Sequence, residues 1–293
     1  MHNNQPLNDQ MPAWRGWIAA IRLKTLPAVL APVILGQFLA WQAASQFSWF
    51  LAAVISGCAL LLQIGVNLAN DVFDFEAGVD GLDRLGPARA AQSGWLTVQQ
   101  LRRGLILVLS LASLLGLVLV AYGGWLFLLL GSLSILAALA YSAGPFPLAS
   151  HALGEVTVFL FFGLLAVVGG FYLQHPEISD SVWGYGAAMG ALTAAIMLVN
   201  NIRDVSSDRA AGKHTLIVII GTDWGRVFYG LLLFSASLWH LQFSLSAIFL
   251  CLISAALWRK LYRREGVALN QQLAQTAVFC LIYSLVVVAD HWI

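Results

Sequence analysis

The chain has 293 residues, of which 60% are hydrophobic and 10% charged, and its mean hydropathy is +0.81. This composition excludes an ordinary soluble globular protein and indicates a helix bundle in a lipid bilayer. The formal net charge of +1 argues neither for nor against a nucleic-acid partner, and we predict none.

Nine apolar segments follow one another along the chain, which predicts an all-α membrane protein with nine transmembrane helices. Most of them reach the about 17–25 residues that a helix needs to cross a bilayer, whereas 125–141, 226–241 and 245–258 lie at or below that range. The segments cover residues 26–44, 48–70, 103–121, 125–141, 155–173, 183–202, 226–241, 245–258 and 271–289.

The basic residues predict the orientation of this bundle. All fifteen Lys and Arg residues lie in the polar N-terminal segment 1–25, in the longer loops, or at the helix ends that meet them. None lies in the short turns or in the C-terminal tail. The positive-inside rule therefore places the N-terminus in the cytoplasm, and nine spans place the C-terminus outside. The longer loops cover 71–102, 142–154, 203–225 and 259–270.

Two clusters of acidic and amide side chains follow the second and the sixth apolar segments. The first covers residues 67–83 and the second residues 200–208, and together they hold seven of the fourteen acidic residues. Carboxylates are costly at a membrane, so their grouping at helix ends indicates a shared task, most simply the binding of divalent cations. The matching positions suggest two like-oriented halves that face one another across a central cavity.

Helical spacing predicts which of these side chains act together. Asn67, Asp71 and Asp74 share one helix face at i, i+4 and i+7, with Asn70 beside it. Asn201, Asp204 and Asp208 form the corresponding face on the sixth segment. Mg²⁺ prefers one or two protein carboxylates, with waters and substrate phosphate oxygens completing its coordination, so the pattern indicates a diphosphate substrate.

Basic residues near both clusters are candidates for binding that diphosphate and for stabilising charge on it as it leaves. The candidates are Arg22, Lys24, Arg84, Arg89, Arg203, Arg209 and Lys213.

Two other interpretations compete with a diphosphate site. Charged residues in cytoplasmic loops are usually only solvated, and Glu155 is explained equally well as a charge at a helix N-terminus. A cation transporter would also place acids within a bundle. Transporters place them near the bilayer midplane, however, where none of the nine segments carries a charge.

The two clusters resemble the motifs of the UbiA superfamily of intramembrane prenyltransferases. That family has an N-D-x-x-D-x-x-x-D motif after its second helix and a D-x-x-x-D motif after its sixth. Asn70, Asp71 and Asp74 match the first motif, and Asp204 and Asp208 match the second. The third acid of the general pattern falls on Gly78, with Asp80 nearby. With this glycine, the chain resembles the branch of the family that prenylates 1,4-dihydroxy-2-naphthoate rather than the branch that prenylates 4-hydroxybenzoate.

Further stretches resemble the same branch, in the expected order and over nearly all of the chain. They are Arg22–Pro27, Gly86–Arg89 with Ser93–Gly94, Tyr141–Pro145, Leu153–Gly163 and Asn200–Leu216.

The resemblance implies a single transmembrane prenyltransferase domain over 1–293, with active-site loops at 71–102 and 203–225. It implies transfer of a polyprenyl group from a polyprenyl diphosphate to 1,4-dihydroxy-2-naphthoate with decarboxylation, as in menaquinone biosynthesis. Transfer to another aromatic acceptor, such as 4-hydroxybenzoate, and the haem and chlorophyll prenyltransferases are the narrower alternatives. The implied location is a bacterial inner membrane, with the active site facing the cytoplasm.

The resemblance also implies roles for individual residues. The implied catalytic residues are Asp71, Asp74, Asp204 and Asp208. The implied Mg²⁺ ligands are Asn67, Asp71, Asp74, Asp80, Asp204 and Asp208. The implied diphosphate- and substrate-binding residues are Lys24, Asn67, Asn70, Arg84, Arg89, Tyr141, Asn201, Arg203 and Lys213. Aromatic residues of the fourth and fifth segments are candidates to line a groove for the apolar tail, namely Trp125, Phe127, Phe159, Phe161 and Phe162.

Overall fold

The computed structural model of the protein describes residues 12–78 and 85–291, apart from the side chain of Lys24. All regular secondary structure in these two ranges is helical. Nine long helical segments occur there, one at each predicted position. They are α2 (Leu26–Ala43), α3 (Trp49–Glu76), α4 (Val98–Gly123), α5 (Trp125–Ala140), the continuous run α6 (Gly154–Val158), η3 (Phe159–Gly169) and α7 (Gly170–Gln174), α8 (Asp180–Ala210), α10 (Thr222–Leu241), α11 (Ala247–Leu261) and α12 (Leu269–Asp290).

Short elements complete the fold at the helix connections. They are α1 (Ala13–Ile21), α9 (Leu216–Ile220) and the 3₁₀ turns η1 (Leu23–Thr25), η2 (Leu148–Ser150) and η4 (Gly266–Ala268).

Local sequence signals set several helix ends. The hydroxyl of Thr97 accepts from the N–H of Gln100, whose side chain accepts from the N–H of Thr97, so a capping box begins α4. Ser48 caps α3 in a similar way. Gly124, with φ of 70°, turns the chain from α4 into α5 in a conformation that residues with a β-carbon rarely adopt.

Six helical segments of the described chain are long and apolar enough to cross a membrane. The chain is therefore a multi-pass membrane protein. Of the other three, α5 is apolar but shorter, α10 carries Asp223 and Arg226 in its first turns, and α11 ends on Arg259 and Lys260. The nine helices confirm the all-α architecture, whereas nine spans and their orientation stay predictions.

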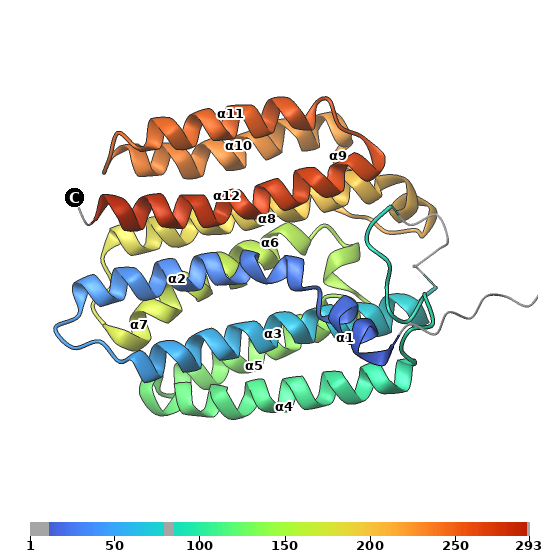
Figure 1. The fold of residues 1–293 in the computed structure, drawn as a ribbon, viewed down its shortest axis with the longest axis horizontal. Coiled ribbons are helices and arrows are strands. Elements are labelled where there is room, and N and C mark those ends of the chain that lie inside the picture. The colour runs from blue at the N-terminus through green and yellow to red at the C-terminus, as the bar shows by residue number, and fades with distance from the viewer. Residues whose placement is uncertain (1–11, 79–84, 292–293) are drawn as a thin grey trace, which may run out of the picture.

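The helices run side by side, and their connections sort to two ends of the molecule (Figure 1). The longer connections, after α3, α5, α8 and α11, lie at the same end as α1. The short turns and the end of α12 lie at the opposite end. The ends of α3 and α8, which carry the two acid clusters, therefore lie at the end that also carries the basic residues.

Exposed tryptophans mark both ends of the bundle. Trp49, Trp125 and Trp183 lie in the first turns of α3, α5 and α8, at the end with the short turns. Trp14 in α1 and Trp224 in α10 lie at the other end and are also exposed. Tryptophan is enriched at the two membrane–water interfaces, so these positions agree with a bilayer around the bundle.

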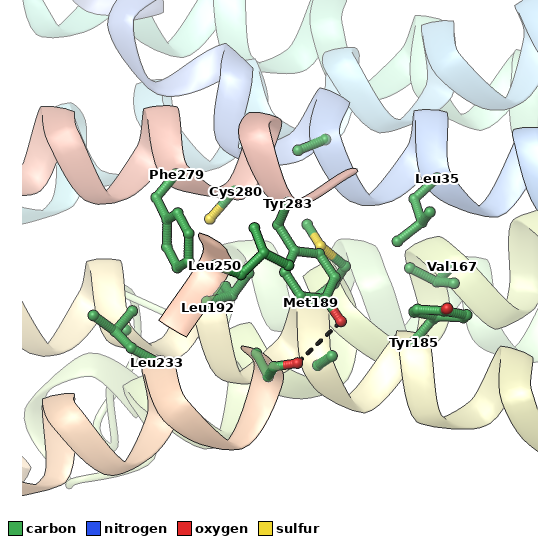
Figure 2. Packing of buried hydrophobic residues seen from close by; sticks show 14 of the residues in the cluster. Leu35, Val167, Tyr185, Met189, Leu192, Leu233, Leu250, Phe279, Cys280 and Tyr283 are labelled. Carbon is green, nitrogen blue, oxygen red and sulfur yellow. Dashed lines mark hydrogen bonds between the residues drawn. The ribbon is translucent and has the colours of Figure 1, made fainter. Parts of the chain in front are cut away.

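Two groups of helices each have a hydrophobic core. The larger core joins α2, η3, α7, α8, α10, α11 and α12, and the smaller joins α1, α3, α4 and the loop 85–97. Helix α2 contacts α3 on one side and α8 and α12 on the other, so it connects the two groups. Figure 2 shows the larger core, where Phe279, Cys280 and Tyr283 of α12 lie among residues of α8, α10 and α11.

Close backbone contact holds η3 against α8. A β-carbon at Gly163 would lie 2.3 Å from Cα of Gly190 and 2.7 Å from the carbonyl oxygen of Gly186. Both facing residues on α8 are themselves glycines, so two helices approach closely at this point, as small residues permit in membrane proteins. This contact fixes η3, which lines the cavity described below, against the helix that carries the second acid cluster.

We expect Gly163→Ala to lower the free energy of unfolding by about 1–3 kcal/mol, because the added methyl group must displace backbone. Thermal unfolding in detergent measures this change. Gly131→Ala in α5 is the matched control, since a β-carbon there meets no atom within 4 Å and alanine favours a helix over glycine. Equal unfolding midpoints for the two variants would contradict the close contact.

Candidate active site

A cavity of about 860 Å³ lies between α2, α3, α5, η3 and α8. Charged and amide side chains line it near the ends of α3 and α8, and mostly apolar side chains line the rest, with a few polar ones such as Gln63, Ser134 and Thr193. The polar set includes Arg22, Asn67, Asn70, Asp74, Arg89, Tyr141, Asn200, Asn201, Arg203, Asp204, Asp208 and Lys213. The apolar set includes Val29, Val33, Ile55, Leu62, Leu119, Phe127, Phe161, Phe162, Leu165 and Leu173. One cavity therefore suits a ligand with a charged head and a long apolar tail.

On α3, the cavity face carries Asp74 and two asparagines. Arg89, from the loop after α3, places its Nη2 atom 2.6 Å from Oδ2 of Asp74. The hydroxyl of Ser142 donates to Oδ1 of Asn70 at 2.7 Å. Asn67 donates to the carbonyl oxygen of Ile21 at 2.9 Å, which ties α3 to the end of α1.

Asp71 differs from its predicted position on this face. The cavity is lined by Asn67, Asn70 and Asp74 but not by Asp71, which is 1% exposed. Its Oδ2 atom accepts from the backbone N–H of Ala90 at 3.1 Å, so the carboxylate faces the loop 85–97. A helix turns 100° per residue, and the rotation of α3 places Asn70 rather than Asp71 toward the cavity. The predicted catalytic and metal-binding roles of Asp71 stay predictions.

The end of α3 explains the glycine that departs from the general family motif. Gly78 follows the helix directly, lines the cavity and has φ of 66°. Glycine adopts this conformation more readily than residues with a β-carbon, which agrees with a glycine at this position.

On α8, all three predicted residues, Asn201, Asp204 and Asp208, line the cavity. Arg203 holds Asp204 with two bonds, from Nε to Oδ1 at 2.8 Å and from Nη2 to Oδ2 at 2.6 Å. The Nζ atom of Lys213 lies 3.4 Å from Oδ1 of Asp208.

The turn after α8 explains how Lys213 reaches back to the helix. Gly212, with φ of 70°, reverses the chain, and the backbone N–H of Lys213 donates to the carbonyl oxygen of Asp208.

The two clusters come together across the cavity, as the sequence predicts. Asp74 on α3 and Asp208 on α8 are near enough for their charges to interact. Tyr141, directly after α5, lines the same cavity. The Tyr141 hydroxyl donates to Sδ of Met197 at 3.0 Å.

Asn270, in the first turn of α12, connects the two clusters outside the cavity. Its Oδ1 atom accepts from Nη1 of Arg203 at 2.7 Å, and its Nδ2 atom donates to the carbonyl oxygen of Leu85 at 2.9 Å. Arg203 belongs to the second cluster, and Leu85 begins the loop that carries Arg89. One side chain therefore positions parts of both clusters.

The other predicted site residues differ in whether the structure describes them and whether they line the cavity. Asp80, Asp83, Arg84 and the side chain of Lys24 lie outside the described residues. Arg89, Tyr141, Asn201, Arg203 and Lys213 line the cavity, as predicted for ligand-binding residues. Phe127, Phe161 and Phe162 also line it. The predictions for Trp125 and Phe159 are wrong, because Trp125 is 76% exposed at the start of α5 and Phe159 packs beside Gly190 of α8.

Three further residues contribute to the site. Asn270 carries no pattern that separates it from ordinary polar residues at helix ends. Ser142 lies in the stretch Tyr141–Pro145 that resembles the family, but nothing in the sequence marks it as a partner of Asn70. Glu155, which the sequence explains equally well as a charge at a helix N-terminus, is 5% exposed and accepts from Nδ2 of Asn201 at 2.7 Å. The signal that could have identified it is a lone carboxylate at the start of a strongly apolar segment.

The cavity offers the ligand type that Mg²⁺ prefers. Asp74, Asp204 and Asp208 present carboxylate oxygens from two helices to one cavity. Within 12–78 and 85–291, no three His, Cys, Asp or Glu residues are close enough to form a complete metal site. This set fits Mg²⁺ that takes its remaining ligands from waters and a bound diphosphate.

Comparison with known proteins gives relatives over almost the full chain. The family described as "UbiA prenyltransferase family" matches residues 29–285. The 1,4-dihydroxy-2-naphthoate octaprenyltransferase of Escherichia coli K12 is 36% identical, with 96% of each chain covered. The protein of that name from Haemophilus influenzae is also 36% identical, over 84% of this chain and 81% of its own.

Solved structures share the fold. A UbiA homolog from Archaeoglobus fulgidus bound to DMAPP and Mg²⁺ matches with a TM-score of 0.68 at 15% identity, covering 93% of this chain and 99% of that one. The apo structure of a UbiA homolog from Aeropyrum pernix matches with a TM-score of 0.66 at 16% identity, covering 96% and 99%.

We expect Asn270→Ala to lower the free energy of unfolding by about 1–3 kcal/mol, because buried Arg203 loses an acceptor. Asn270→Asp keeps an oxygen for Arg203 but loses the donor to Leu85, so its loss of stability is smaller. Both variants should speed amide hydrogen exchange in residues 85–97. Wild-type exchange in both would show that Asn270 does not hold this loop.

Proposed function

Because the chain belongs to the UbiA prenyltransferase family, we propose that it transfers a polyprenyl group from a polyprenyl diphosphate to 1,4-dihydroxy-2-naphthoate in menaquinone biosynthesis. The observation that carries this proposal is the cavity itself. Its charged end joins the acids of α3 and α8 to Arg89, Arg203 and Lys213, and its remainder is apolar. The named relatives support the naphthoate as the acceptor.

The charged end of the cavity suits the diphosphate of the donor. Arg89, Arg203 and Lys213 line it and supply cationic donors that match phosphate oxygens. Each lies beside a carboxylate in the described structure, so diphosphate binding redistributes existing ion pairs rather than burying new isolated charge. The apolar lining beyond them, including Phe161 and Phe162, accommodates the prenyl chain.

Mg²⁺ is the cofactor that we propose for this end of the cavity. Asp74, Asp204 and Asp208 are the carboxylates in place to hold it. Asn67, Asp71 and Asp80 are further candidate ligands from the sequence. When bound, Mg²⁺ neutralises negative charge on the diphosphate and so favours its departure.

The proposed reaction breaks the bond between C1 of the prenyl chain and the diphosphate oxygen, and the electron pair leaves with the diphosphate. Arg89, Arg203 and Lys213 stabilise the charge that builds up there. The electron-rich ring carbon that carries the carboxylate forms the new bond to C1. Loss of the ring carboxylate as CO₂ returns an electron pair to the ring. The apolar walls exclude water, which would otherwise capture the allylic cation.

Two alternatives predict different substrates. Transfer to 4-hydroxybenzoate is disfavoured by the naphthoate relatives and by Gly78, which departs from the general family motif. A cation transporter is disfavoured because the carboxylates that line the cavity lie near the ends of α3 and α8 rather than midway along the helices.

We also propose that the protein lies in a bacterial inner membrane with its charged cavity end facing the cytoplasm. The support is the confinement of every Lys and Arg residue to the N-terminal segment, the longer loops and the helix ends beside them.

Purified protein with Mg²⁺ and a polyprenyl diphosphate is expected to prenylate 1,4-dihydroxy-2-naphthoate and release CO₂. Chromatography of the prenylated dihydroxynaphthalene product and trapping of labelled CO₂ measure the two outcomes. Turnover of 4-hydroxybenzoate without turnover of the naphthoate would overturn the proposed acceptor.

A pair of matched variants links this activity to the cavity. Asp204→Asn should lower kcat by about 10²–10³-fold, because it removes a carboxylate from the charged end. Asp223→Asn makes the same chemical change at a 92% exposed side chain of α10 and should leave activity unchanged.

Orientation is testable with single cysteines in a background without Cys58, Cys251 and Cys280. Glu177→Cys lies in the short turn before α8, and Arg263→Cys lies in the loop after α11; both positions are exposed. A membrane-impermeant maleimide added to intact spheroplasts should label the cysteine at 177 but reach the one at 263 only after permeabilisation. The reverse pattern would invert the proposed topology.

A further inference from the structure

A buried carboxyl–amide pair lies at one wall of the cavity. Glu155, in the first turn of α6, is 5% exposed, and Asn201 of α8 is 3% exposed. The Nδ2 atom of Asn201 donates to Oε1 of Glu155 at 2.7 Å. Asn201 lines the cavity, whereas Glu155 lies behind it and does not.

This pair fixes which end of the Asn201 amide is offered to a ligand. The Asn201 amide donates its N–H to Glu155, so its nitrogen faces Glu155 and its carbonyl oxygen faces away from that side chain. Among the described residues, none donates to that carbonyl oxygen, although Asn201 lines the cavity. The wall therefore presents a hydrogen-bond acceptor that Glu155 holds in one orientation.

The position of Asn201 along α8 matches the place of the reaction. Asn201 precedes Asp204 by three residues, which is about 4.5 Å along a helix. In the proposed function, the diphosphate lies at Asp204 and Asp208, and C1 of the prenyl chain is one bond away from it. The amide oxygen of Asn201 is thus one turn further into the cavity, near the level at which C1 must meet the acceptor ring.

We propose that the carbonyl oxygen of Asn201 accepts a hydrogen bond from a ring hydroxyl of the aromatic acceptor, with Glu155 as the positioning residue behind it. This inference rests on the proposed function, because the substrate there is a dihydroxylated ring. A hydroxyl that donates to an amide oxygen releases more electron density into its ring. The contact therefore both orients the ring and favours its attack on C1.

A structural role for Glu155 alone does not account for its surroundings. Its Oε2 atom is buried and has no hydrogen-bond partner within the described chain. A carboxyl group kept only for stability would be expected to satisfy both oxygens, because an unpartnered buried oxygen is destabilising. Glu155 also lies close to the cavity wall. A β-carbon added to Gly154, the residue before it, would lie only 3.3 Å from the hydroxyl of Tyr141, which lines the cavity.

The test measures binding rather than turnover, on the purified full chain without prenyl diphosphate and under anaerobic conditions. The probes are 1,4-dihydroxy-2-naphthoate and 2-naphthoate, which share a carboxylate and a ring system and differ in the hydroxyls. Wild-type protein is expected to bind the dihydroxy compound about tenfold more tightly, the effect of one buried hydrogen bond. Glu155→Gln should largely remove this preference, because a glutamine amide can either donate or accept and no longer fixes Asn201.

Asn201→Leu, which is similar in volume and has no acceptor, should also remove the preference while still binding 2-naphthoate. Glu177→Gln repeats the charge change at an exposed turn and should keep the wild-type preference. Thermal unfolding shows whether each variant is folded. The comparison of the two naphthoates on wild-type protein tests the inference even if a variant fails to fold.

Absence of a preference in wild-type protein, or its persistence in Glu155→Gln and Asn201→Leu, would overturn the inference. Prenyl transfer to the naphthoate in the same preparation would then show that the proposed function stands without it. A preference that depends on both residues, in a preparation with no prenyl transfer, would instead support the hydroxyl contact and count against the proposed function.

Discussion

The rest of the site depends on the pairing of charges in a medium that solvates them poorly. Asp74, Asp204 and Asp208 line the cavity, and each lies beside a basic side chain from the same end of the bundle. An isolated carboxylate there would be strongly destabilising, whereas a paired one is tolerated. The same pairing supplies both kinds of group that a magnesium diphosphate needs. Stability without ligand and affinity for ligand therefore come from the same residues.

This requirement also explains the contacts that described loop residues make with the helices beside the cavity. Arg89 reaches Asp74 from the loop after α3, Lys213 reaches Asp208 through the turn at Gly212, and Asn270 joins Arg203 to Leu85. The helices supply acids at fixed positions, and the loops bring cations to them. The apolar cavity beyond needs no such pairing, because its lining residues carry no charge.

Most of the fold was predictable from the sequence, because hydropathy and segment length are local properties. All nine predicted segments are helices, and the two acid clusters lie at the same end of the bundle. The predictions were weaker where neighbouring elements decide the outcome. Trp125 is exposed and Phe159 packs against α8, since an apolar side chain suits lipid, a helix interface or a cavity equally well.

The sequence by itself determined the membrane class, the helices and the two acid clusters, because these follow from composition and from spacing along the chain. Its motifs also resemble those of the family to which the chain belongs. Only the tertiary structure decided which side of each helix faces the cavity. Asn70 lines it while Asp71 turns to Ala90, because contacts with α1 and the loop 85–97 set the rotation of α3. Only the tertiary structure, likewise, placed Glu155 behind Asn201, residues that lie 46 positions apart in the chain. Spacing along one helix cannot specify a contact between two helices, since that contact depends on how all the helices pack.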